Sequence, residues 1–109
     1  MSDVITSDTT EPGVPASLTL EINPPIKHAG ASYDSFVLRE PTIGEVRKSD
    51  RYLNGGITQE SLRNRSIWLI SFVSGVPVPV IESCGISTLN RAMAYLNVFL
   101  ELGRGTGES

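Results

Sequence analysis

The segment from Phe36 to Val46, FVLREPTIGEV, constrains the fold more than any other part of the chain. It begins with the alternation of an extended strand, and Pro41 then disfavours the helical conformation for Glu40. Thr42 follows in the position of a helix N-cap, and Glu45 three residues later completes the pattern of a capping box. We therefore predict a strand that ends just before Pro41 and a helix that begins at Thr42.

Length and composition indicate one small domain. The chain has 109 residues, and its hydrophobic fraction of 39% is sufficient for a modest core. The net charge of −3 argues against a dedicated nucleic-acid binder. Cys84 is the single cysteine, which excludes an intramolecular disulfide and fits a reducing compartment. No Cys/His cluster stands at a metal-ligand spacing, so we expect neither a metal nor a cofactor.

The two ends of the chain differ in composition from its middle. Residues 1–16 are short of apolar side chains and contain Pro12, Gly13 and Pro15, which predicts a disordered leader. Residues 103–109 are predicted to be a flexible tail, which leaves residues 17–102 as the folded domain. The N-terminus lacks the pattern of a signal peptide, and Ile67–Val73 is too short an apolar run to span a membrane.

Two alternating segments predict an antiparallel β-hairpin with one face on the core. In the first segment, Asn23-Pro24-Pro25 follows the apolar residues and is expected to stop the strand. A loop is expected over residues 26–32, and the second strand over residues 33–39. The inward-facing apolar residues are expected to be Leu18, Leu20, Ile22, Phe36 and Leu38.

Helix start and stop signals divide the remaining sequence. The first helix is predicted over residues 42–53, the second over residues 59–74 and the last over residues 87–102. The proline-rich residues 77–83 allow a single helical turn or an extended crossover. The predicted fold class is therefore α+β, with an N-terminal antiparallel hairpin followed by about three helices in one domain.

The last helix has more apolar surface than one core contact requires. Leu89, Met93, Leu96 and Leu100 form one stripe at helical spacing. A second stripe lies nearly opposite and consists of Tyr95, Val98 and Leu102, while Trp68 lies outside the apolar stripe of its own helix. Two interpretations stay open: these four residues bind a partner, or the second stripe packs under the hairpin or closes a homodimer.

The sequence offers no convincing catalytic arrangement. His28 is the only histidine and falls in the predicted hairpin loop, without a nucleophile or carboxylate at a motif spacing. Cys84 has an apolar neighbourhood typical of a small core residue. Glu40 and Glu45 could be paired as acid and base, but the capping box explains Glu45 better. We therefore predict no catalytic residues.

The order of several short motifs resembles a known family. After the hairpin comes Phe-x-Leu-Arg-x-Pro-Thr-x-Gly-Glu, then a Trp/Leu/Ile-rich helix that ends in Ser74-Gly75-Val76-Pro77, and a last helix finishing in Phe99-Leu100. Over about residues 18 to 101 this order resembles the small tail assembly chaperones of contractile-tailed and Mu-like phages. One departure is Ser87-Thr88, where the family pattern has an acidic residue.

The resemblance implies a protein that is not an enzyme. Such chaperones are expected to bind the phage tape measure protein, keep it soluble and help the tail tube assemble, with the tail tube protein as a further partner. They act in the host bacterial cytoplasm and are expected to be absent from the mature virion. A homo-oligomer is also expected, whereas specific nucleic acid and membrane partners are not.

Two other functions compete with this interpretation. A small nucleic-acid-binding regulator would use the basic residues of segment 47–65, which we interpret instead as solvated helix faces: Arg47, Lys48, Arg51, Arg63 and Arg65. A structural tail component would be retained in the virion, where a chaperone would be absent.

The predicted capping box leads to a first test. Replacing Thr42 with alanine removes the acceptor for a backbone N–H in the first turn, and we expect a loss of about 1 kcal/mol in the free energy of unfolding. Urea unfolding of Thr42→Ala measures this loss. An unchanged midpoint would mean that the helix begins at another residue.

Overall fold

A computed structural model describes residues 14–108, with side chains described through Glu101. Residues 1–13, most of the predicted leader, lie outside this range, as does Ser109. The predicted α+β fold class is confirmed, because an antiparallel hairpin precedes the helices of one compact unit. The elements are β2 (Ser17–His28), β3 (Ala31–Arg39), α1 (Ile43–Asp50), the 3-10 turn η1 (Arg51–Leu53), α2 (Gln59–Ser74), α3 (Val78–Ser83) and α4 (Ile86–Glu108).

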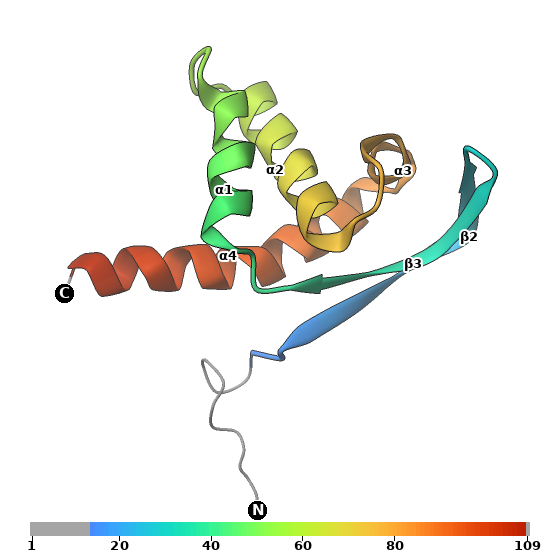
Figure 1. Ribbon diagram of the computed structural model, residues 1–109, viewed down its shortest axis with the longest axis horizontal. Helices are drawn as coiled ribbons and strands as arrows, with labels where there is room; N and C mark the ends of the chain where they lie inside the picture. The colour runs from blue at the N-terminus through green and yellow to red at the C-terminus, as the bar shows by residue number, and fades with distance from the viewer. Residues whose placement is uncertain (1–13, 109) are drawn as a thin grey trace, which may run out of the picture.

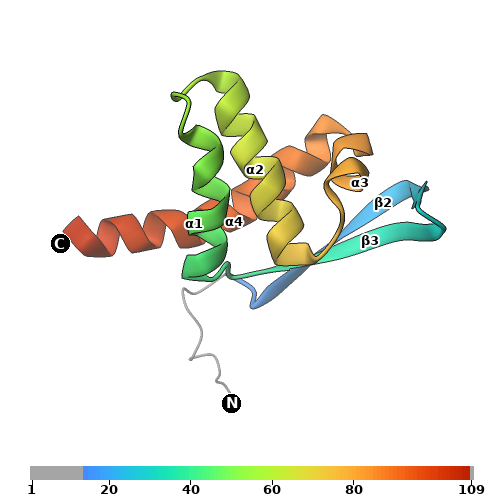
Figure 2. The same cartoon turned by 45° about the horizontal axis from the view of Figure 1, so that its top comes forward.

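The helices gather around one face of the hairpin. Helices α1 and α2 run side by side, and the short α3 lies near the strand β2 (Figures 1 and 2). Helix α4 crosses the molecule, and its C-terminal part extends past α1 in both views (Figures 1 and 2). The turn end of the hairpin points away from the α1–α2 pair (Figures 1 and 2).

The hairpin is longer than the sequence predicted. Strand β2 does not stop at Asn23-Pro24-Pro25 but continues to His28, so the predicted loop over residues 26–32 is wrong. The proline N atoms cannot donate to the strand ladder, and the register shifts between Glu21 and Ile26 to form a bulge around them. Ala29 and Gly30 form the turn, both with positive φ (52° and 83°), as a two-residue hairpin loop requires.

The junction between β3 and α1 has the predicted capping box and one further interaction. Thr42 Oγ1 accepts from the Glu45 backbone N–H at 3.1 Å, and Glu45 Oε1 accepts from the Thr42 N–H at 2.9 Å. In addition, Arg39 at the end of β3 donates to both carboxylate oxygens of Glu45, at 2.9 and 2.8 Å. The two-pronged ion pair and the cap therefore tie the last residue of the strand to the first turn of the helix.

Local signals located the helix ends well, with one exception. Helix α2 has the predicted bounds, with Thr58 as N-cap and Gly75 in the left-handed conformation after its last residue. The first predicted helix divides into α1 and η1. Helix α4 begins one residue earlier than predicted and continues beyond Leu102 to Glu108, through the region predicted to be a flexible tail. Glycine disfavours helix without excluding it, at about 1 kcal/mol for each residue.

The core lies between the inner face of the hairpin and the helices. Leu38, Leu69, Val80 and Leu96 are fully buried, and Leu20, Phe36 and Ile70 are nearly so. Other side chains of α4 pack against this cluster from its edge: Leu89, Met93, Phe99 and Leu100. The predicted inward faces of the hairpin and of the last helix are therefore confirmed.

The core also has a contact at the N-terminal edge of the described chain. The Tyr95 hydroxyl donates to the Pro15 carbonyl oxygen at 2.8 Å, and Val14 packs against the core cluster. Burial raises the pKa of Tyr95, and the nearby negative charge of Glu40 adds to this shift. Pro15 belongs to the segment predicted as a leader, so the last residues of that segment lie on the domain.

The Arg39–Glu45 pair predicts a pH-dependent contribution to stability. The hydrogen bonds from Arg39 lower the pKa of Glu45 from 4.5 to about 2. Because the folded pKa is the lower one, the stabilisation is complete above about pH 4.5 and is lost as the pH falls through about 2. We expect Glu45→Gln to lower the free energy of unfolding by about 1 kcal/mol at pH 7, since the ion pair is partly exposed, and by almost nothing at pH 2.

Urea unfolding of the wild type and Glu45→Gln between pH 7 and pH 2 measures this difference. Glu60→Gln, at an exposed carboxylate in the first turn of α2, is the matched control. A difference between wild type and Glu45→Gln that stays constant with pH would contradict the role of the ion pair.

The Tyr95 hydrogen bond leads to a third test. Tyr95→Phe keeps the ring in the core and removes only the hydroxyl, so we expect a loss of about 1 kcal/mol. Tyr33→Phe, at a partly buried tyrosine of β3, is the control. Deleting residues 1–16 removes the acceptor and should cost less in the Tyr95→Phe background than in the wild type. Equal costs in both backgrounds would show that the bond contributes nothing.

Candidate partner-binding surface

Trp68, the first of the predicted contact residues, belongs to an aromatic cluster on the α1 side of α2. Its ring stacks on Tyr52 with centroids 5.0 Å apart and planes within 5°, and it meets Phe72 at 5.7 Å. Lys48 Nζ lies 5.0 Å from the centroid of the Phe72 ring. Trp68 is therefore partly buried between α2 and η1, and it keeps some accessible surface outside the main core.

Tyr95, the second predicted contact residue, is a core residue. It is only 7% exposed, and its ring packs edge-on against Phe99 with centroids 5.3 Å apart. Of the two interpretations left open for its stripe, the burial of Tyr95 agrees with packing within the fold. Helix α4 contacts both α2 and the hairpin, so more than one of its stripes is covered.

The remaining two predicted residues lie further along α4. Val98 is partly exposed. The backbone of Leu102 lies in α4, but its side chain is outside the described residues. The structure thus brings Tyr95 together with Phe99 and Trp68 together with Tyr52, in two separate clusters.

The structure shows an apolar cleft that the sequence analysis did not identify. It has a volume of about 190 Å³ and lies where α2, α3 and the start of α4 meet. Its apolar lining consists of Ile67, Ile81, Cys84, Ile86 and Leu89. Ile86 is 62% exposed, although it is the first residue of α4, a helix that packs on the core. We call this site the Ile86 cleft. In the sequence, Ile67 falls outside the apolar stripe of its helix, as Trp68 does, whereas Ile86 stands just before the predicted last helix and carried no signal.

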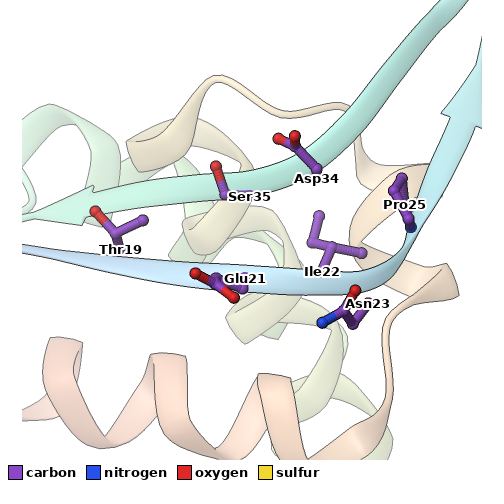
Figure 3. Close-up of a pocket in the computed structure, with 7 residues that line it drawn as sticks. All are labelled: Thr19, Glu21, Ile22, Asn23, Pro25, Asp34 and Ser35. Carbon is purple, nitrogen blue, oxygen red and sulfur yellow. The ribbon is translucent and has the colours of Figure 1, made fainter.

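A second, larger hollow of about 410 Å³ lies at the bend of the hairpin, around the bulge (Figure 3). Its lining includes Thr19, Glu21, Asn23, Asp34 and Ser35, which supply carboxylates, hydroxyls and an amide. The carboxyl groups of Glu21 and Asp34 do not point toward one another in Figure 3. This arrangement contains neither a nucleophile–base pair nor converging ligands, so it suits solvation better than catalysis.

His28 and Cys84, the candidates for catalytic residues, are not arranged for catalysis. His28 is the last residue of β2, beside the turn, and Cys84 is the C-cap residue of α3. Burial raises the pKa of the Cys84 thiol, and its Sγ donates to the Val80 carbonyl oxygen at 3.4 Å, which disfavours a reactive thiolate. Within residues 14–108, no three His, Cys, Asp or Glu side chains are grouped so that they could hold a metal ion.

The basic segment is partly engaged in internal contacts. Arg65 pairs with Asp50 at 3.3 Å, and Lys48 lies over the Phe72 ring. Arg47, Arg51 and Arg63 are exposed. Among the helices of the described chain, none has both the length and the apolar character required of a membrane span.

Comparison with known proteins gives one family. The profile described as phage tail assembly chaperone proteins, E, or 41 or 14, matches residues 18–101. No curated protein and no solved structure matches the chain. The matched range runs from the first strand to the part of α4 that packs on the core. Because it covers most of the sequence, the chain belongs to the phage tail assembly chaperone family, and it is not an enzyme.

Proposed function

We propose that this chaperone binds the tape measure protein of its phage and keeps it soluble while the tail tube assembles around it. The observation that carries the proposal is the amount of exposed aliphatic surface on a small domain of this family. Among the side chains that the structure describes, five large apolar ones are between 40% and 81% exposed: Val37, Ile43, Ile57, Leu62 and Ile86. Exposed apolar surface is what a protein needs to cover the apolar helices expected of a tape measure protein.

The proposed mechanism is reversible shielding. The chaperone covers apolar segments of the long partner, which would otherwise associate with one another, and it leaves as tube subunits replace it. Contact with the tail tube protein and self-association of the chaperone belong to the same proposal. So do its place in the host bacterial cytoplasm and its absence from the mature virion.

Trp68, Val98 and Leu102 are retained as proposed contact residues, and Tyr95 is not. Trp68 is partly exposed within its aromatic cluster, and aromatic side chains are frequent hot spots in protein interfaces. Tyr95 is buried, so a polar substitution there would disturb the core before it reported on binding.

The two alternative functions have less support. A nucleic-acid-binding regulator would need its cations available on one face, yet Arg65 pairs with Asp50 and Lys48 lies over an aromatic ring. The chain's net charge of −3 also opposes binding to a polyanion. A structural tail component would be found in purified virions, which distinguishes it from a departing chaperone.

Co-expression tests the proposed function. The tape measure protein of the same phage, produced together with this chain, should move from the insoluble to the soluble fraction and co-purify with it. The control is the same vector producing an unrelated small acidic protein. A tape measure protein that stays equally insoluble in both cultures would contradict the proposal.

A further inference from the structure

The Ile86 cleft has the size of a site for one side chain. Its volume of about 190 Å³ lies below the roughly 300 Å³ at which small-molecule sites begin. Its walls are aliphatic, with Ile67 from α2, Ile81 from α3, and Ile86 and Leu89 from α4. An apolar group that inserts into the cleft would remove this aliphatic surface from water, which would stabilise the complex. The cleft therefore suits the anchor residue of a protein partner rather than a metabolite.

Opposite charges also line the cleft. Arg63 comes from α2 and Glu82 from α3, and both residues are exposed. Among the described residues, no ion pair involves either side chain. A partner that places a carboxylate beside Arg63 and a cation beside Glu82 would complement both, whereas a uniformly charged or entirely apolar partner would not.

The lining residues also have helical spacing. Arg63 and Ile67 are one turn apart on α2, and Ile86 and Leu89 are one turn apart on α4. Side chains on adjacent turns of a helix form a ridge. Two such helices leave a groove between their ridges, and the side-chain ridge of a third helix can pack into that groove. This arrangement favours an amphipathic helix as the occupant.

We propose that the Ile86 cleft binds an amphipathic helix of the tape measure protein, which inserts one large apolar side chain and places an acidic group beside Arg63 and a basic group beside Glu82. This inference rests on the proposed function, because it assigns a site to the partner named there.

A pair of matched substitutions tests the anchor. Ile86→Ser removes aliphatic surface from the cleft, and Ala31→Ser introduces the same hydroxyl at an exposed residue of β3 that does not line the cleft. We expect Ile86→Ser to raise the Kd for the purified tape measure protein roughly tenfold or more, and Ala31→Ser to leave it nearly unchanged. Circular dichroism and thermal unfolding verify that both variants stay folded.

Charge reversal tests the rim of the cleft. Arg63→Glu and Glu82→Lys change exposed side chains, so we expect little effect on folding. Each should raise the Kd about three- to tenfold at 50 mM salt and less at 500 mM, because salt screens exposed charges. A Kd that neither variant changes at either salt concentration would overturn the assignment of the charged groups.

Cysteine labelling reports on the site independently of affinity. In a Cys84→Ser background, Ile86→Cys and Ala31→Cys place one exposed thiol inside and one outside the cleft. With saturating tape measure protein, a maleimide should label Ile86→Cys several-fold more slowly than in the free chain and Ala31→Cys at an unchanged rate. Equal rates at Ile86→Cys with and without the partner would overturn the proposal.

Binding measurements on the wild-type chain and on Ile86→Ser distinguish an error in the proposed site from an error in the proposed function. If the wild-type chain binds the tape measure protein and Ile86→Ser binds it equally well, the cleft is not the site, although the proposed function stands. If the wild-type chain does not bind that protein, the proposed function itself fails. If the wild-type chain is a dimer in sedimentation and Ile86→Ser is a monomer that still binds the tape measure protein, the occupant is a second copy, which also overturns the proposal.

Discussion

The packing of the hairpin's inner face against α2 and α4 is the contact on which the rest of the structure depends. A two-stranded hairpin is at best marginally stable alone in water, and it needs a hydrophobic surface to cover one face. Leu38 supplies the centre of that face and is completely buried, as are Leu69 of α2 and Leu96 of α4. Each such side chain contributes roughly 1.5–3 kcal/mol when it leaves water. The helices therefore hold the hairpin, and the hairpin in turn gives α2 and α4 a common surface to pack on.

The junction after β3 orients α1 on this core mainly through polar contacts. Helix α1 is short, and Ser49 is its one fully buried residue. Its first turn is held by Arg39 and the Thr42–Glu45 box, and the turn that follows it is held by the stack of Tyr52 on Trp68. Helix α1 buries too little apolar surface to be fixed by core packing alone. Hydrogen bonds and one aromatic stack therefore fix its position. This explains why Trp68 lies outside the apolar stripe of α2.

The proposed binding site is also explained by which apolar residues are buried and which are left exposed. Helix α4 gives its buried surface to the hairpin and α2, while its first residue, Ile86, is exposed beside α3. A single apolar anchor with opposite charges at its edge gives a specific contact of moderate strength, because each exposed charge pair adds little. Moderate strength would suit the proposed function, in which the chaperone releases its partner when tube subunits arrive. Several copies along a long partner would cover it without any one contact being tight.

The sequence by itself determined the elements whose signals are local. Thr42 with Glu45, and Thr58 with Gly75, specify helix ends through their own backbone hydrogen bonds, so the order of hairpin and helices could be predicted. Only the tertiary structure decided which faces are covered. Periodicity groups side chains on a helix but does not say how many neighbours pack on it. For that reason the sequence left open whether Tyr95 faces a partner or the fold, and the structure buries it in the core, whereas Ile86 lies exposed in a cleft. Likewise, Pro24 and Pro25 interrupt the ladder locally, but the pairing of Ile26 with Tyr33 and of His28 with Ala31 carries β2 on to His28. The residue pattern of one strand does not show which residues of the other strand pair with it.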